Sequence, residues 1–173
     1  MYDEVSLELS RKAWVTWKDM GVLDKWGDGT ITRDVIDTMV GEHGRGGRHH
    51  GGGFYEYGED GSKAIWPGLM DLYFNADASV AEDDMKDRLL FRQVIEALKC
   101  LETNVLRTVA DGNIGSIMGI GAPAWTGGLI QFVNTYGLER FSARCAELAN
   151  QYGDRFDAPA IVGEKIAAGE TFA

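Results

Sequence analysis

Glycine is concentrated in a segment that otherwise has the apolar character of a helical core, and this combination restricts the folds open to the chain. Between residues 111 and 137, apolar residues surround Pro123 and a group of glycines, namely Gly115, Gly119, Gly121, Gly127 and Gly128. A glycine inside a helix costs about 1 kcal/mol relative to alanine. A sequence that accepts several of them usually gains close backbone packing or sharp turns. We therefore expect a tightly packed corner between two helices here.

The composition is that of a globular protein with an acidic surface. The chain has 173 residues, of which 45% are hydrophobic and 25% charged, and its formal net charge is −10. This charge opposes nucleic-acid binding, which depends on Lys and Arg neutralising phosphates. No apolar run approaches the roughly 20 residues of a membrane span. With two cysteines, Cys100 and Cys145, and no secretory signal pattern, we expect a cytoplasmic protein without disulfides.

Apolar periodicity predicts an all-α fold, because apolar residues recur three and four positions apart along most of the chain. A first helix is expected over residues 3–20 and ends at Gly21, and Thr32 is expected to cap the next helix after a turn at 26–30. A short helix is expected from Trp66 to about Phe74. Further helices are predicted over 81–110, which is the longest, and then near 127–136, 138–152 and 159–168.

Residues 41–53 contain seven glycines, so no regular element is expected to persist there. Three interpretations of this basic loop are open. It is a mobile surface connector, or its backbone N–H groups with Arg45 and Arg48 contact a phosphate. In the third, a metal is held by His43, His49 and His50, although no well-spaced carboxylate or thiol lies near them. The segment Phe54–Tyr57 that follows is expected to be extended.

The common catalytic motifs are absent from the sequence. No Gly-x-Gly-x-x-Gly follows a predicted strand, and no Gly-x-Ser-x-Gly elbow occurs. Neither cysteine has a histidine near it in sequence. Asp83 and Asp84 are interpreted as the solvated start of a helix, where carboxylates suit the helix dipole, and not as an acid–base pair. The chain therefore appears short of catalytic groups.

Several of these motifs together resemble the α-helical domains of 3-hydroxyacyl-CoA dehydrogenases. Gly52-Gly53-Phe54-Tyr55-Glu56-Tyr57, after the basic glycine loop, is similar to the close of one such domain. The second half is similar to the terminal helical repeat of the multifunctional fatty-acid β-oxidation chains. The segments that carry this likeness are 88–109, Asp111–Ser116, Gly119–Pro123, Gly127-Gly128 and Leu148–Phe156 followed by Pro159.

The resemblance implies two tandem helical units of the 6-phosphogluconate dehydrogenase C-terminal-like fold. The first, residues 1–75, lacks its opening helix, and the second spans 76–173. The family oxidises L-3-hydroxyacyl-CoA to 3-ketoacyl-CoA with NAD, and its catalytic His–Glu pair lies in a Rossmann domain to which no position here corresponds. We therefore expect no catalytic residue and no metal ligand in this stretch. The acyl-CoA substrate and the Rossmann domain of the same chain are the expected partners.

Two positions are candidates for cofactor contact. Relatives often have a lysine before the Gly-x-Gly-Phe-Tyr element, in contact with the dinucleotide, and His49 stands at that place with Arg48 just before it. The alternative function is a stand-alone helical binding or assembly module without redox activity. The missing opening helix would leave a face exposed or covered by another copy, so we also expect self-association. The residues of that face are Val5, Leu9, Trp14 and Trp17.

Overall fold

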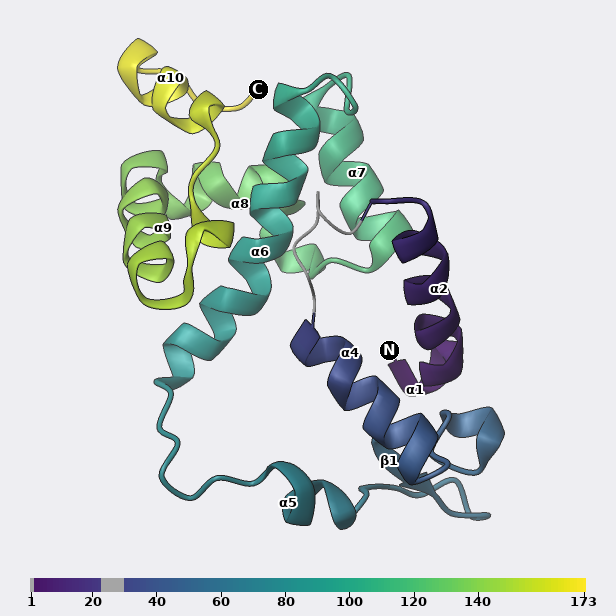
Figure 1. Ribbon diagram of the computed structural model, residues 1–173. Coiled ribbons are helices and arrows are strands. Elements are labelled where there is room, and N and C mark those ends of the chain that lie inside the picture. Colours follow the sequence, from purple (N-terminus) through teal and green to yellow (C-terminus); the bar gives the residue numbers. More distant parts are fainter. Residues whose placement is uncertain (1, 23–29) are drawn as a thin grey trace. The chain divides into compact units, whose positions relative to one another are not determined.

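The computed structural model describes residues 2–22 and 30–173, and it is predominantly helical (Figure 1). The expected all-α fold class is confirmed. The expected turn at 26–30 lies outside the described residues except for Thr30. The chain forms two compact units, Met1–Ala78 (unit 1) and Ser79–Ala173 (unit 2). Among the described helices, none is long and apolar enough to cross a membrane.

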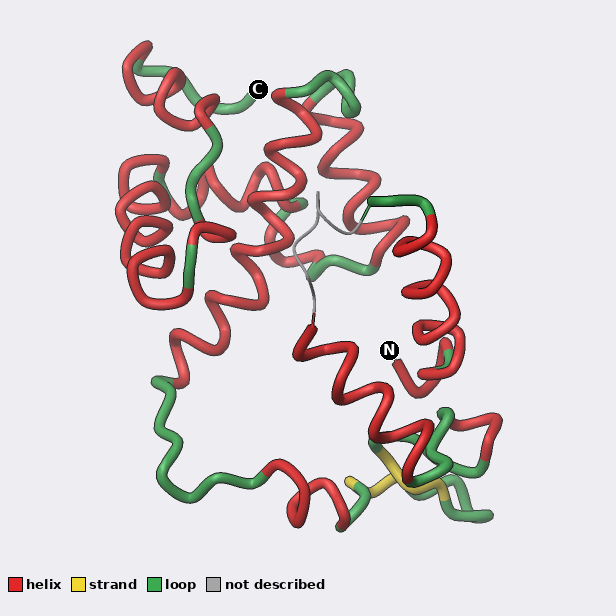
Figure 2. Tube along the Cα trace, viewed as in Figure 1, coloured by secondary structure: helices red, strands yellow, loops and turns green. Residues whose placement is uncertain are grey.

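Unit 1 consists of short helices and one small hairpin. Its elements are α1 (Tyr2–Val5), α2 (Leu7–Asp19), α4 (Thr30–Asp37), the π-helix η1 (Thr38–Glu42), the 3₁₀ turn η2 (Arg48–His50), β1 (Tyr55–Tyr57), β2 (Lys63–Ile65) and α5 (Gly68–Tyr73). Figure 2 shows the two strands, which pair antiparallel with Tyr55 opposite Ile65. The extended segment and the short helix after Trp66 are confirmed, whereas the partner strand β2 was not predicted.

Two local predictions in unit 1 are wrong. Thr32 does not cap the second helix, because α4 already begins at Thr30 and Thr32 lies within its first turn. The glycine loop also contains short regular elements. The helix that starts at Thr30 continues as a π-turn to Glu42, and Arg48–His50 form a 3₁₀ turn. Glycine reduces the stability of such elements but does not prevent single turns that are fixed by their surroundings.

Unit 2 is a helical bundle. Its elements are α6 (Glu82–Glu102), α7 (Val109–Ile120), the 3₁₀ turn η3 (Ala124–Thr126), α8 (Leu129–Tyr136), α9 (Leu138–Tyr152), the 3₁₀ turn η4 (Asp154–Phe156) and α10 (Ala160–Ala168). The helices α8, α9 and α10 agree closely with the predicted helices, whereas α7 lies where a glycine-rich corner was expected and was not predicted as a helix. Pro159 precedes α10 directly, as expected of proline at a helix start. The predicted helix over 81–110 is too long, because α6 ends at Glu102.

The end of α6 is set by a left-handed residue. Asn104 has φ 58°, and the N–H of Leu106 donates to the carbonyl of Cys100 at 2.9 Å, which closes the last turn. The chain then restarts as α7 behind Thr108, whose hydroxyl accepts from the N–H of Asp111. Val105, expected in the apolar stripe of one long helix, is 73% exposed as a result.

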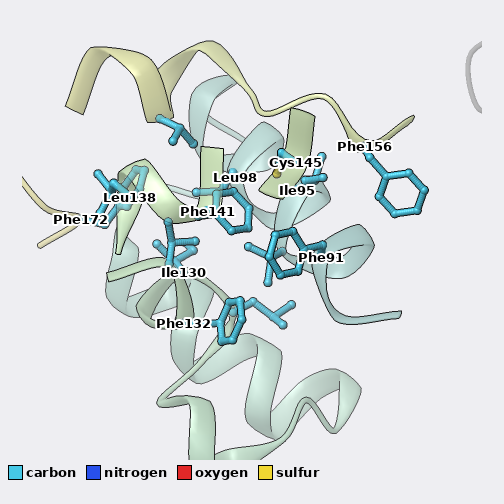
Figure 3. Packing of buried hydrophobic residues seen from close by; sticks show 14 of the residues in the cluster. Phe91, Ile95, Leu98, Ile130, Phe132, Leu138, Phe141, Cys145, Phe156 and Phe172 are labelled. Atoms are coloured by element: carbon cyan, nitrogen blue, oxygen red, sulfur yellow. The ribbon is translucent and has the colours of Figure 1, made fainter. Parts of the chain in front are cut away.

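The core of unit 2 forms where α6 crosses α8 and α9. Phe91 is fully buried, stacks on Phe141 with ring centroids 4.7 Å apart, and meets Tyr136 edge-on at 5.3 Å. Figure 3 shows the rings of Phe91 and Phe141 among the other buried side chains of this core. The thiol of Cys145 belongs to this core, and burial raises its pKa to about 12. It therefore behaves as a small apolar side chain.

The glycine-rich corner permits close contact between α7 and α8. A Cβ on Gly128 would lie 2.5 Å from the Cα of Asn113, and one on Gly112 would lie 2.5 Å from the Cδ1 of Ile130. The backbone N–H groups of Ile130 and Gln131, at the start of α8, both donate to the Oδ1 of Asn113. The expected tight corner is thus present, although α7 itself remains helical through three of its glycines.

Asp84 is not the solvated residue that the sequence predicts. Its carboxylate accepts a hydrogen bond from the Tyr152 hydroxyl at 2.7 Å and one from the Arg144 guanidinium, and its side chain is only 13% exposed. Arg144 also binds Asp87 at 2.8 Å. These contacts attach the first turns of α6 to α9, so the carboxylate has a structural role that helix-dipole reasoning alone does not reveal.

This cluster predicts an acid-sensitive unit 2. The hydrogen bonds from Tyr152 and Arg144 hold the pKa of Asp84 below its ordinary value of 3.8. A carboxylate with a lowered folded-state pKa stabilises the fold above its unfolded-state pKa, and that stabilisation is lost as the pH falls through the folded value. Asp84→Asn should therefore lower the melting temperature at neutral pH and flatten its decline below about pH 4.

Thermal unfolding of the full chain, followed from about pH 7 down to pH 2.5, measures this. Asp83→Asn is the matched control, because Asp83 is the exposed neighbour on the same helical turn. If Asp84→Asn and Asp83→Asn give the same pH profile, the proposed coupling is absent.

Candidate functional site

The basic loop of unit 1, residues 41–53, is anchored at its end by a buried carboxylate from α1. Asp3, in α1, is 3% exposed. Its two oxygens accept hydrogen bonds from the N–H of Phe54 at 2.9 Å, the N–H of Tyr55 at 3.0 Å and the hydroxyl of Tyr57 at 3.1 Å. Burial and the hydrogen bond to Asp3 raise the pKa of Tyr57. We call the contact of Asp3 with the backbone of Phe54 the unit 1 clamp.

Gly53 is required for this arrangement. A Cβ at that position would lie 2.6 Å from the carboxyl carbon of Asp3, so a larger residue would displace the carboxylate. The absence of a side chain at Gly53 thus allows this segment to lie close to Asp3 of α1. Glycine motifs are often interpreted in terms of ligands, whereas this one accommodates a side chain of the same unit.

Arg45 is occupied by the fold and is not presented to a ligand. Its guanidinium donates to the carbonyl oxygens of Gly53 at 2.6 Å and Tyr55 at 2.9 Å. It also lies over the ring of Trp66, 4.5 Å from the centroid, and its side chain is 14% exposed. This geometry does not favour the interpretation in which Arg45 contacts a phosphate, because two of its donors already bind backbone carbonyls and its ring contact holds it against Trp66.

Backbone hydrogen bonds close the loop on itself. Gly47 and Gly52 exchange N–H···O bonds of 2.9 and 3.1 Å, and the N–H of Leu7 donates to the carbonyl of Gly46 at 2.9 Å. The segment between Gly47 and Gly52 contains the 3₁₀ turn η2. The interpretation of the loop as a connector without regular structure therefore does not describe this segment. Its three side chains all point to the surface, since Arg48, His49 and His50 are exposed.

The two predicted cofactor contacts, Arg48 and His49, thus lie side by side on one exposed turn. Arg48 donates to the carboxylate of Glu4 at 3.3 Å and lies 5.2 Å from the ring centroid of Tyr57. In the part of the chain that the structure describes, His49 has no hydrogen-bond or ion-pair partner. The turn therefore offers one cationic edge, partly neutralised by Glu4, with a histidine beside it.

The three histidines do not converge on one point. His43 packs against Trp66 with ring centroids 5.1 Å apart, while His50 lies 3.7 Å from the carboxylate of Glu8. Among residues 2–22 and 30–173, no group of three metal-binding side chains has the spacing to hold an ion. His43 therefore takes part in packing and His50 lies beside a surface carboxylate, and neither contact involves His49.

Unit 2 contains a clamp of the same kind. The amide of Asn134, in α8, accepts from the N–H of Phe172 at 2.9 Å and donates to its carbonyl at 2.7 Å. Three residues after Asn134 comes Gly137, with φ 92° and ψ 124°, and then Leu138, which is 6% exposed. A polar side chain in a short helix thus binds the backbone of a distant phenylalanine.

The turn that follows the clamp is also repeated in unit 1. Three residues after Asp3 comes Ser6, with φ 96° and ψ 125°, and then Leu7, which is fully buried. Positive φ is uncommon for serine, so its agreement with Gly137 points to a shared backbone design. The sequence also has the pattern Gly-x-x-Phe at Gly51–Phe54 and again at Gly169–Phe172, and these two phenylalanines are the ones that the clamps bind.

The protein is thus an all-α protein of two helical units. Each unit contains one clamp, in which a polar side chain binds the backbone of a distant phenylalanine. No family model matches the chain. Its sequence is 30% identical over 159 residues to the fatty acid oxidation complex subunit alpha of Vibrio campbellii, and 30% identical over 159 residues to that of Vibrio parahaemolyticus.

Both comparisons cover 90% of this chain and 21% of the relative, so the chain spans about a fifth of the length of the curated relatives it matches. The resemblance to fatty-acid β-oxidation chains that the motifs indicate is thereby confirmed. These relatives are alpha subunits of the fatty acid oxidation complex.

Removing the unit 1 clamp should release the loop that carries Arg48 and His49. Asp3→Ala leaves two partly buried backbone N–H groups, those of Phe54 and Tyr55, without this acceptor, which costs about 3 kcal/mol. Hydrogen exchange of the Phe54 and Tyr55 amides should then accelerate about 100-fold. Mass spectrometry of peptides that cover residues 53–57 measures this.

Asp3→Asn keeps one oxygen acceptor and should show a smaller increase. Asp71→Ala changes an exposed acid in the same unit and should show none. Equal exchange rates in wild type and Asp3→Ala would contradict the clamp.

Proposed function

We propose that the chain is the C-terminal helical portion of an NAD-dependent 3-hydroxyacyl-CoA dehydrogenase of fatty-acid β-oxidation. The observation that carries this proposal is the similarity to fatty acid oxidation complex alpha subunits over 159 residues of an all-α fold. The parent protein would oxidise L-3-hydroxyacyl-CoA to 3-ketoacyl-CoA by hydride transfer to NAD. That redox step belongs to a dinucleotide-binding domain outside this stretch.

The part described here would act as a scaffold. It would supply one wall of the acyl-CoA cleft, a docking surface for the Rossmann domain and a core that imitates a dimer of single helical domains. The paired clamps support the tandem arrangement, because Asp3 with Phe54 and Asn134 with Phe172 repeat one backbone design. Charged side chains such as Arg45 and Arg144 are committed to internal contacts, which suits a structural role.

In the η2 turn, Arg48 and His49 would make only a minor contribution to cofactor binding. NAD, when bound to the parent, accepts the hydride. Arg48 and His49 would contribute a cationic edge toward one of its phosphates, and a single Arg on an exposed turn can do this. The Glu4 carboxylate beside Arg48 limits the strength of such a contact. We assign the main hold on the dinucleotide to the Rossmann domain.

The purified chain should show no dehydrogenase activity. When it is mixed with acetoacetyl-CoA and NADH, absorbance at the NADH band should stay constant, because this stretch supplies no acid–base pair for the hydride transfer. Turnover that follows the concentration of the chain, and that survives repurification, would contradict the scaffold assignment.

Activity should appear when the chain replaces the matching segment of the Vibrio campbellii alpha subunit. In that chimera, Arg48→Ala combined with His49→Ala should raise the KM for NADH a few-fold and leave kcat unchanged. Arg107→Ala, at an exposed arginine of unit 2, is the control. An unchanged KM would remove these two residues from the cofactor site.

A further inference from the structure

A cleft of about 300 Å³ lies between α2 and α4 of unit 1. Its α2 wall is formed by Arg11, Trp14, Val15 and Lys18, which stand at positions i, i+3, i+4 and i+7. This spacing defines one face of a helix, and such a face is usually apolar where it meets another helix. Here a cation stands at each end of the face. The cleft therefore combines positive charge with an apolar middle, at a volume typical of smaller ligand pockets.

The α4 wall orients two arginines for a ligand. Asp37 accepts the Nε–H of Arg11 at 2.8 Å with one oxygen and the Nε–H of Arg33 at 3.3 Å with the other. Among the residues that the structure describes, no acceptor is hydrogen-bonded to the Nη groups of either arginine. Their side chains are 48% and 52% exposed, so these N–H donors remain accessible. Paired N–H donors of arginine suit the oxygens of a phosphate.

The other end of the cleft offers one hydrogen-bond donor and one acceptor. Lys18 and Asp19 are the last residues of α2, and both line the cleft. In the described parts of the chain, neither side chain has a hydrogen-bond or ion-pair partner. Because Asp19 follows Arg11 by eight residues, the two ends of the cleft are about 12 Å apart along the axis of α2. This distance matches the length of an extended nucleoside monophosphate.

The middle of the cleft suits a flat aromatic ring. Trp14 is half-buried, and Ile36 on the opposite wall is 2% exposed. Nucleotide bases stack on such aromatic side chains through their π-faces. Adenine also carries an amino donor beside a ring-nitrogen acceptor. A carboxylate and an ammonium group, as in Asp19 and Lys18, complement that edge. The order of groups along the cleft thus corresponds to a phosphate, then a base, then the amino edge of the base.

We propose that the cleft between α2 and α4 binds an adenosine phosphate. The phosphate lies on the Nη groups of Arg11 and Arg33. The adenine lies against Trp14, with its amino edge toward Lys18 and Asp19. Three cations and two carboxylates line the cleft, so its net charge is +1 in a chain of net charge −10. This site goes beyond the proposed function, which assigns no ligand to this cleft.

Isothermal titration calorimetry of the full chain with AMP tests this site, and saturable binding is expected. Arg33→Gln should weaken the binding about tenfold, because it removes charged donors to the phosphate. Combining Arg33→Gln with Lys18→Gln should weaken it about 100-fold. Both side chains are exposed, so the fold does not depend on them. Circular dichroism of each variant verifies that the helices are retained.

Lys12→Gln is the matched control. Lys12 lies on the same helix, pairs with Glu8 at 3.2 Å and does not line the cleft. This variant removes the same unit of charge as Arg33→Gln and should change the affinity less than about twofold. Adenosine and inorganic phosphate are two further probes, because each carries one half of the ligand. Each should bind about tenfold or more weakly than AMP.

Absence of saturable binding up to about 1 mM AMP, or equal loss in Arg33→Gln and Lys12→Gln, would overturn the proposal. So would inorganic phosphate that binds as tightly as AMP, because the base would then make no contact. CoA, which also carries a phosphorylated adenosine, distinguishes two sources of the ligand. If CoA displaces AMP, the cleft holds the nucleotide end of CoA, and if it does not, the cleft holds a free nucleotide. These measurements do not depend on dehydrogenase activity in the chimera, so a failed binding site and a failed functional assignment are distinguishable.

Discussion

In each unit of this protein a polar side chain binds the backbone of a distant phenylalanine, and this side chain is buried in unit 1 and partly buried in unit 2. In unit 1 the side chain is a carboxylate that reaches a segment 51 residues away, and in unit 2 it is an amide that reaches 38 residues. A buried polar group is costly unless its hydrogen bonds are satisfied. Each clamp therefore requires two distant segments to lie in contact, Asp3 with Phe54 and Asn134 with Phe172. The helices between the two segments must be arranged so that this contact can form.

The contacts that position the candidate site also explain why it offers little chemistry of its own. Asp3 and Arg45 hold the basic loop from within, so Arg48 and His49 are left on an exposed turn. In unit 2, Arg144 is likewise used to attach one helix to another. A scaffold that positions a separate catalytic domain needs this kind of rigidity more than it needs reactive groups.

The sequence predicted what depends on local patterns and missed what depends on distant pairs. The helices α8, α9 and α10 follow from apolar periodicity, and the short helix after Trp66 follows from its turn residues. The end of α6 was missed because Asn104 is a weak stop signal compared with glycine or proline. The buried role of Asp84 and the clamp of Asp3 were missed because their partners lie far along the chain. The cofactor contact of His49 stays a prediction that depends on the family resemblance alone.

The central claim is that the two units share one clamp design, although unit 1 has a much smaller buried core. Among the described residues, the buried apolar cluster of unit 1 consists of Leu7, Ile36 and Met39, whereas unit 2 has a far larger one. Native-state hydrogen exchange of the full chain, resolved by residue, compares the two directly. The account predicts that amides of α2 open at a lower free energy than those of α9. Equal protection of the two helices, or greater protection of α2, would contradict it.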